Sequence, residues 1–447
     1  MTNHYFSRRR FLSGLGVTAL LSRLGWMNAL AQATPPDYKA LVCVFLGGGN
    51  DGHNTIVPLT QADFNSYKAA RGSLALPDNN GALLQVATPE GTPFGLNPGL
   101  TAIHPLWAQG KLAVLANAGM LVQPTSRAQF LANSVPVPTN LFSHSDQVQQ
   151  RQSGIPSTSG GTGWGGRAAD ALHMLNGAST FPATVSIAGP SLFCIGNIVQ
   201  AASLLPGFNL DVSGMNLWPQ AAAAARKAGL QQVLEFDSGL ALVQAANKVR
   251  KDALDLNAML TGNDATLTTQ FPGTSLGDQL KQVAKIIKLR ATTGISRQVF
   301  LCSIGGFDTH GAQGWQHWDL LRQVSEALAA FYNSTIEMGV ADRVTSFTLW
   351  DFGRSLQPSG SGSNHGWGKH QLILGGAVQG GKMYGAFPTL ALGGPDDSGS
   401  RGALIPSTST EQYGATLAAW LGVPANQLGS VFPNLGNFGT QNLGFMS

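Results

Sequence analysis

Short, almost continuous apolar runs alternate along the chain with segments whose apolar residues have a helical spacing. The apolar runs span residues 39–46, 111–117, 182–189, 298–306, 344–350 and 371–376. A strand that is apolar on both faces is typical of a parallel sheet with helices on both sides. The pattern therefore predicts an α/β fold, a three-layer sandwich around a mostly parallel central sheet.

The helical segments fill most of the chain between these runs. We expect helices near residues 61–71, 100–109, 145–152, 165–176, 218–228, 236–260, 276–291, 316–338 and 410–421. The section 200–292 contains helices and loops but no convincing strand. We interpret it as a helical insertion within a single domain that spans 39–447, because sheet-forming segments lie on both sides of it.

The first 31 residues have the pattern of an export signal. The basic stretch 7-SRRRFLS-13 precedes the apolar stretch 14-GLGVTALLSRLG-25 and the small-x-small cleavage pattern 29-ALA-31. A twin arginine followed by x-Phe-Leu resembles signals read by the twin-arginine translocase. We therefore expect this translocase as a partner, cleavage of residues 1–31, and a periplasmic or secreted mature protein. An uncleaved anchor or a basic surface helix is the alternative, but Arg23 interrupts an apolar stretch that is short for a membrane span.

Removal of this signal changes the net charge. The chain has 27 basic and 23 acidic residues, and four of the basic residues but no acid lie within 1–31. The remainder has 27 − 4 = 23 basic residues against 23 acids, so it is neutral and predicts no nucleic-acid partner. No later segment is long and apolar enough to cross a bilayer, so we expect no stable membrane span after cleavage.

The cysteine count argues against a disulfide scaffold. There are three cysteines, and two of them, Cys43 and Cys302, lie within apolar runs. The third is Cys194. Buried thiols are the expected role of the first two rather than catalysis.

Three of the predicted strands end at an acid. These acids are Asp51, Asp308 and Asp351. Ligands of open parallel sheets bind beyond the carboxyl ends of the strands, so these acids can converge although they are far apart in sequence. The nearby histidines are His310, His365 and His370. Carboxylates and imidazoles at one edge predict a site for a divalent ion such as zinc or manganese, whereas the alternative for each acid is a turn or helix cap.

Glycines precede the first acid, in 44-VFLGGGNDGHNT-55. They allow the backbone to approach other segments closely and can direct amide groups toward an anion.

Hydroxyl groups near these positions are candidate nucleophiles. Thr55 lies beside Asp51, and 142-FSHSDQVQQRQ-152 places Ser143, His144 and Ser145 before a predicted helix. A helix N-terminus and a metal ion both favour an alkoxide. The alternative is that Ser145 or Asp146 caps the helix.

A second motif competes with this interpretation. The stretch 273-GTSLG-277 matches the G-x-S-x-G nucleophile elbow around Ser275. The segment before it, 265-ATLTTQFP-272, does not have the pattern of a buried strand and ends in proline. We therefore interpret Ser275 and Asp278 as a capping box.

Several of these motifs resemble a known family. The stretches 43-CVFLGGGNDGHNTIVPL-59, 143-SHSDQ-147, 305-GGFDTHG-311, 351-DFGRSLQPSGSGSNHGWGKHQLILGGAVQGGKMYG-385 and 401-RGALIPSTSTEQYGATLAAWLGV-423 are similar to the bacterial "domain of unknown function 1501" family. That family is grouped with the alkaline phosphatase and sulfatase superfamily. The resemblance implies an alkaline-phosphatase-like fold, with one or two metal ions and a hydroxyl or modified-cysteine nucleophile.

By this resemblance the metal ligands would be Asp51, Asp308, His310, His365 and His370, with a hydroxyl near Ser143 as the nucleophile. The chain departs from the family at two positions. Asn364 stands where the family usually has an aspartate, and Asp351 where it usually has a glutamate. Both remain in the predicted metal site, but the weaker negative charge at Asn364 favours one ion over two.

The expected activity is metal-dependent hydrolysis of a phosphate or sulfate ester. Zinc, manganese or calcium would activate Ser143, the glycine amides and Arg354 would hold the anionic oxygens, and His144 or His370 would protonate the leaving group. Arg354 has a second expected role, pairing with an acid. The ligand would be a small anionic ester or a glycan.

The alternative is a non-catalytic protein that binds a sugar or cell-wall ligand. Trp164, Trp315, Trp318 and Trp367 are candidates for sugar stacking, with core packing as the default for most of them.

Overall fold

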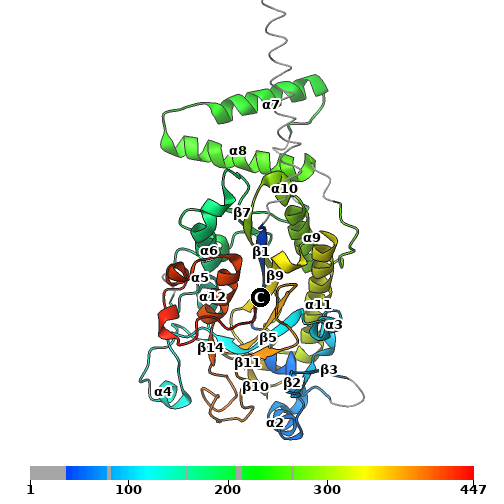
Figure 1. Cartoon of the computed structure of the whole chain (residues 1–447), viewed down its shortest axis with the longest axis vertical. Coiled ribbons are helices and arrows are strands. Elements are labelled where there is room, and N and C mark those ends of the chain that lie inside the picture. Colours follow the sequence, from blue (N-terminus) through cyan, green and yellow to red (C-terminus); the bar gives the residue numbers. More distant parts are fainter. Residues whose placement is uncertain (1–36, 78–81, 158–159, 208–213, 263–265) are drawn as a thin grey trace, which may run out of the picture.

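The computed structural model describes residues 37–77, 82–157, 160–207, 214–262 and 266–447. The predicted signal, residues 1–31, lies outside these ranges. The described chain forms a large central sheet with the strand order β13-β5-β12-β9-β1-β8-β6-β7, and β14 pairs with β5 (Figure 1). The strands are β1 Lys39–Leu46, β5 Leu112–Gly119, β6 Thr184–Ser186, β7 Ala201–Ser203, β8 Arg297–Ile304, β9 Val344–Trp350, β12 Lys369–Gly375, β13 Met383–Tyr384 and β14 Thr408–Ser409.

The sheet is mostly parallel, which confirms the predicted α/β class. Two details differ from the expectation. β12 runs antiparallel to both of its neighbours, β5 and β9. The section 200–292 also contributes a short edge strand, β7, that pairs with β6.

Two smaller sheets lie outside this one. β2 Ile56–Pro58, β4 Pro93–Leu96 and β3 Leu84–Ala87 form one of them. The other is the antiparallel pair β10 Arg354–Ser359 and β11 Gly362–His365.

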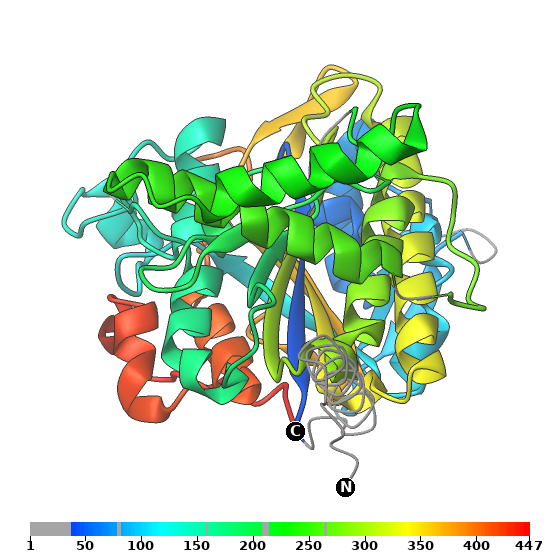
Figure 2. The same ribbon diagram turned by 90° about the horizontal axis from the view of Figure 1, so that it is seen from above.

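Helices cover both faces of the central sheet. Helices α9 and α11 pack on one face and α6 and α12 on the other, whereas α7 and α8 cross one end of the molecule (Figures 1 and 2). The helices are α2 Gln61–Arg71, α3 Pro105–Ala108, α4 Arg127–Leu131, α5 His144–Ser153, α6 Trp164–Leu172, α7 Gln220–Glu235, α8 Ala241–Gly262, α9 Ser275–Lys288, α10 Arg290–Thr293, α11 Gln313–Glu337, α12 Thr410–Leu421 and α13 Leu428–Val431. This arrangement is the predicted three-layer sandwich.

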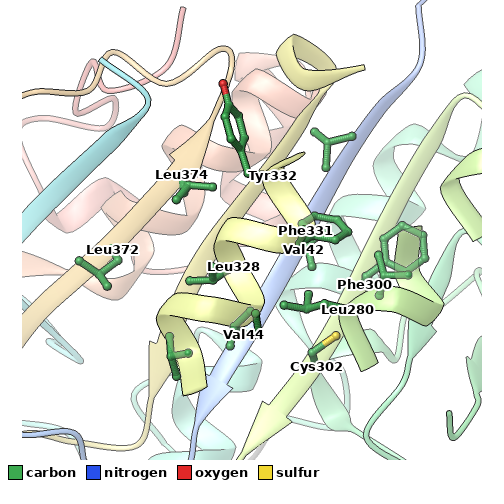
Figure 3. Packing of buried hydrophobic residues seen from close by; sticks show 14 of the residues in the cluster. Val42, Val44, Leu280, Phe300, Cys302, Leu328, Phe331, Tyr332, Leu372 and Leu374 are labelled. Carbon is green, nitrogen blue, oxygen red and sulfur yellow. The ribbon is translucent and has the colours of Figure 1, made fainter. Parts of the chain in front are cut away.

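Strand β1 shows why its apolar run is continuous. Val42 and Val44 belong to the core cluster on the side of α9 and α11, whereas Leu41, Cys43 and Phe45 belong to the cluster on the opposite face. Figure 3 shows Val42 and Val44 beside side chains of α9, α11 and β8. Successive side chains of a strand point to opposite faces, so a strand buried on both faces needs an apolar residue at every position.

All three cysteines are buried and carry free thiols, as expected for the two in apolar runs. Among the described helices, none combines the length and apolar character that a membrane crossing requires.

Three strand ends meet at one edge of the sheet. In the parallel ladders, Leu46 of β1 pairs with Ile304 of β8 and with Trp350 of β9. The segments that follow these strands therefore begin side by side. Because β12 is antiparallel, its first residue, Lys369, starts at this same edge, opposite Ala118 near the end of β5.

Candidate metal centre

Three side chains from different parts of the chain converge at this edge. One potential ligand atom of each of His144, Asp308 and His365 lies within 4.8 Å of the others. His144 Nε2 lies 3.4 Å from Asp308 Oδ2, and His365 Nε2 lies 3.2 Å from Asp308 Oδ1. His144 is the first residue of α5, Asp308 follows β8, and His365 ends β11. The register of the sheet therefore brings together groups that are up to 221 positions apart.

The Nδ1 atom of each of the two imidazole rings already makes a hydrogen bond within the protein. His144 Nδ1 donates to Asp351 Oδ2 at 2.6 Å, and His365 Nδ1 donates to the carbonyl oxygen of Phe142 at 2.8 Å. A carboxylate and a carbonyl only accept, so both Nδ1 atoms carry the proton. The Nε2 atom of each ring therefore faces the carboxylate of Asp308, where it could hold either a proton or a metal ion.

The contact between His144 and Asp308 is not satisfied by a hydrogen bond. Within the described part of the chain, His144 Nε2 is buried and has no hydrogen-bond partner. Lone pairs that face carboxylate oxygens at this range repel unless a proton or a cation lies between them. Two imidazoles and a carboxylate, each oriented by a second group, are also a ligand set that suits zinc. The residues present therefore fit a divalent ion.

His310 and Arg354 flank Asp308. His310 Nε2 lies 3.0 Å from Asp308 Oδ1 and 3.0 Å from His365 Nε2. Arg354 Nη1 donates to the same carboxylate oxygen at 2.6 Å. Burial raises the pKa of Asp308, but the hydrogen bond and charge of Arg354 outweigh it, so the pKa lies below its ordinary value and the carboxylate is ionised.

Arg354 is fully buried, and its guanidinium is occupied. Besides Asp308, it donates to the carbonyl oxygen of Ser363. Of the two roles expected for Arg354, the described contacts match pairing with an acid, because no donor of this fork points to an open position beside Asp308.

Asp351 orients a ligand and lies behind the cluster. It is 1% exposed, and besides His144 it accepts from the amide of Gly48 at 3.2 Å through both oxygens. The glycine amide expected to face an anionic substrate is thus directed to a carboxylate of the protein. Gly48 has φ +112°, and a Cβ there would lie 2.4 Å from the amide nitrogen of Asp308. Glycine is required at position 48 because the loop carrying Asp308 passes directly over it.

Asp51, predicted as a ligand, lies in the interior instead. It is fully buried, it forms an ion pair with Arg71 of α2, and it accepts from Gln313 of α11 and from the amide of His53. Burial raises the pKa of Asp51, but Arg71 and the neighbouring cations outweigh this and lower it below its ordinary value. Its oxygens are occupied by the protein, so we leave Asp51 out of the site.

His370 also lies in the interior. Its ring stacks on Phe387 with centroids 4.9 Å apart, and its Nδ1 accepts from the amide of Asn117. Burial lowers the pKa of His370 to about 3 and that of the adjacent Lys369 to about 7. Among the described residues, Lys369 Nζ and His370 Nε2 have no hydrogen-bond partner. His370 therefore does not lie where either predicted role, metal ligand or proton donor, would require it.

Asn364 precedes His365 on β11, and its backbone amide donates to the hydroxyl of Ser355. Side chains alternate along a strand, so the side chain of Asn364 points to the face opposite His365. It is not part of the cluster, and the loss of a negative charge there relative to the family does not reach Asp308.

Ser143 lies at the rim of the cluster. It is the N-cap of α5 between Phe142, which accepts from His365, and His144. Its hydroxyl donates to Asp146 and lies 3.2 Å from Ser145 Oγ, and it makes no capping bond to the helix backbone. The cap is thus Ser143 rather than Ser145 or Asp146.

The other two hydroxyl candidates do not lie at the cluster. The hydroxyl of Thr55 is buried and donates to the carbonyl oxygen of Asp51. Ser275 is the first residue of α9, and the hydroxyl of Thr274 caps this helix by accepting from Gly277. The cap therefore lies one residue before the expected Ser275. The expected capping box at Ser275 and Asp278 is wrong, because the third helical residue is Gly277, which has no side chain to complete a box. The stretch is also not an elbow after a strand.

Sequence reasoning missed three features of this region. It placed His144 as a proton donor, whereas the structure groups its ring with the candidate ligands. It also did not foresee Arg71 and Gln313, which bind Asp51. An arginine at the end of an amphipathic helix gives no local sign that its side chain turns inward. The only signal of an interior polar region was the run 369-KHQLILG-375, which is otherwise apolar toward its end but begins with a lysine.

The fold and site define an α/β protein with a candidate metal centre at the carboxyl edge of a mostly parallel sheet. The family model "Protein of unknown function (DUF1501)" matches residues 38–400, so the chain belongs to this family. The search of curated proteins gave no match.

Three solved structures match this chain at low sequence identity. The lipoteichoic acid synthase LtaP from Listeria monocytogenes has 9% identity and a TM-score of 0.33, over 94% of this chain and 80% of that one. The PsFucS1 sulfatase from Pseudoalteromonas sp. has 11% identity and a TM-score of 0.31, over 82% and 68%. Ps i-CgsB in complex with k-i-k-neocarrahexaose has 12% identity and a TM-score of 0.36, over 91% and 75%. At such scores these similarities support no inference about the activity of this chain.

Proposed function

We propose that the protein is an exported hydrolase of a phosphate or sulfate ester that uses a divalent cation held by His144, Asp308 and His365. The observation that supports it is that the Nε2 atoms of His144 and His365 both face the ionised carboxylate of Asp308. Arg354 offsets the charge of this carboxylate, but the buried Nε2 of His144 has no hydrogen-bond partner in the described chain, and a divalent cation would give all three groups a common partner. His310 lies beside this set as a further ligand or as a proton donor to the leaving group.

Each neighbouring residue has a role in this proposal. Asp351 and the carbonyl of Phe142 fix the tautomers of the two histidines, and Arg354 fixes the orientation of Asp308. A bound dication would polarise the ester oxygen and favour the deprotonated form of a nearby hydroxyl. Ser143 is the candidate nucleophile, because it lies at the N-terminus of α5, where the helix dipole favours an alkoxide. Its hydroxyl must first turn away from Asp146.

A non-catalytic binding protein is the second candidate. It is favoured by the engaged state of two groups that catalysis would need. The hydroxyl of Ser143 donates to Asp146, and the guanidinium of Arg354 is taken by Asp308 and Ser363.

Metal analysis by mass spectrometry tests the proposal. We expect about one equivalent of zinc, manganese or calcium in protein purified from its native compartment, and loss of this metal in Asp308→Asn. Asp351→Asn should weaken metal binding about 10- to 100-fold, because it releases the ring of His144. His173→Ala is the matched control, since this exposed histidine bonds only within its own helix.

Hydrolysis of p-nitrophenyl phosphate and p-nitrophenyl sulfate by the metal-loaded protein separates the two candidates. Loss of this activity in a Ser143→Ala variant that still binds its metal supports the hydrolase. Metal-free wild-type protein that is inert toward both esters would exclude it and leave the binding protein.

A further inference from the structure

Two tryptophans lie on the first turns of α11, directly after the segment that carries Asp308 and His310. The rings of Trp315 and Trp318 are stacked, with centroids 5.3 Å apart and planes inclined by 29°. Trp315 is 66% exposed, although an indole of this size is normally covered in a protein without a ligand. Trp164 and Trp367, the other two candidates for sugar stacking, are buried in the core.

The stacked pair is close to the candidate metal centre. Trp315 is five positions after His310, so their Cα atoms are at most about 17 Å apart even for a fully extended chain. Side chains of a helix lean toward its N-terminus, which directs Trp315 back toward His310. His310 and Asp308 are both exposed.

The surface between the two features is flat. The exposed residues between His310 and Trp315 are Gly311, Ala312 and Gly314, and a Cβ added at Gly314 would meet nothing within 4 Å. The one large side chain in this stretch, Gln313, turns inward to Asp51 and Ser363. Within this stretch an extended molecule would meet only small residues, and Ser361 borders it, with its Oγ 3.7 Å from a Cβ added at Gly311.

Trp318 is held in place by charged neighbours. The guanidinium of Arg322 lies 6.0 Å from its ring, and Arg322 pairs with Asp319 and Glu326. A rigid aromatic face with planar polar side chains at its rim suits a sugar ring, which has an apolar face and hydroxyl groups around its edge. A single flat indole pair is too small for a lipid surface. The chain beyond residue 31 is neutral, so it has no excess of basic residues to bind the phosphates of a nucleic acid.

We propose that Trp315 and Trp318 form a stacking platform for a glycan, which is the ligand that carries the ester to the candidate metal centre. The second clause rests on the proposed hydrolase, whereas the platform itself does not. The chemical class of the substrate is then an oligosaccharide or polysaccharide that bears phosphate or sulfate groups.

The test is binding of the full mature chain to an array of neutral, phosphorylated and sulfated glycans, followed by calorimetry with the strongest binder. We expect Trp315→Ala to raise the Kd by about tenfold or more, and Trp315→Tyr to recover part of this loss. Trp218→Ala is the matched control, because Trp218 is 87% exposed and lies at the start of the α7 region. Circular dichroism checks that each variant is folded.

The outcomes separate the platform from the hydrolase. Glycan binding that depends on Trp315 and survives in Asp308→Asn supports the platform, even if the wild-type protein holds no metal and the hydrolase is excluded. If no glycan on the array binds, or if Trp315→Ala binds as the wild type does, the platform is overturned. Trp315-dependent binding of oligo(dT) without any glycan binding would also overturn it in favour of base stacking.

Discussion

Two of the aspartate–arginine pairs in the described chain differ in their access to water. Asp308 and Arg354 form the outer pair, in which the carboxylate is 44% exposed. Asp51 and Arg71 form the inner pair, in which both side chains are fully buried. The oxygens of the outer carboxylate face imidazole nitrogens, whereas those of the inner carboxylate accept hydrogen bonds from protein donors. The comparison shows that an acid after a strand can serve as a metal ligand only if its neighbours leave its oxygens accessible.

The largest effect on stability is expected from breaking the inner pair. Arg71→Ala leaves the buried carboxylate of Asp51 without its cation, and it also removes donors to the carbonyl oxygens of Ser355 and Leu356. We expect a loss of about 3–5 kcal/mol in the free energy of unfolding, measured by urea titration. Arg322→Ala, which breaks a partly exposed pair, should lose less than about 1 kcal/mol. Equal losses in the two variants would mean that the inner pair has no special role.

A smaller effect, dependent on pH, is expected at Lys369. Its pKa of about 7 in the folded protein lies below the ordinary value of 10.5, because burial disfavours the charged amine. The folded protein then binds fewer protons than the unfolded chain between these values, so the free energy of unfolding should rise with pH over about 7 to 10.

Lys369→Met removes this dependence. The variant should be more stable than the wild type at pH 6 by about 1–3 kcal/mol, because the described chain offers Nζ no partner. The advantage should shrink as the pH approaches 10. Parallel stability curves for the two proteins between pH 6 and 10 would contradict the assignment.

Breaking the outer pair should cost little stability but most of the bound metal. Asp308→Asn keeps an oxygen that can accept from Arg354, and the position is partly exposed. We expect a loss of about 1 kcal/mol or less in urea titration, together with loss of the bound ion. A large loss of stability with metal retained would reverse the roles of the two pairs.

The smallest effect is expected at Asn364. Restoring the acid of the family pattern by Asn364→Asp should change the metal Kd less than about twofold and the free energy of unfolding by less than about 0.5 kcal/mol, because the side chain faces away from His365. Calorimetric titration of the metal-free protein with zinc measures the first quantity. A tenfold gain in affinity would place Asn364 in the ligand set.

The strands could be predicted well because burial on both faces leaves a direct mark in the sequence. β1 and β9 match the expected ranges residue for residue. The direction of β12 could not be predicted, since an apolar run has the same pattern in either orientation. Its reversal nevertheless decides the site, because it brings the hairpin with His365 back to the edge where Asp308 lies.

The candidate site could be predicted only in part. The order of strand and acid correctly indicated that Asp308 and His365 would meet. It could not distinguish Asp308 from Asp51, because the difference comes from Arg71 and Gln313, which lie on helices from distant parts of the chain. His144 was indistinguishable from a residue of an ordinary helix start until its ring was seen beside Asp308.

The tight crossing at Gly48 has a consequence for genetics. Position 48 has no side chain, yet a single added methyl group would collide with the backbone of Asp308, which lies 260 residues later in the chain. A mutational scan should therefore score position 48 among the most sensitive in the chain, alongside residues that touch the ion. Sensitivity in such a scan would reveal where two loops cross as readily as where chemistry occurs.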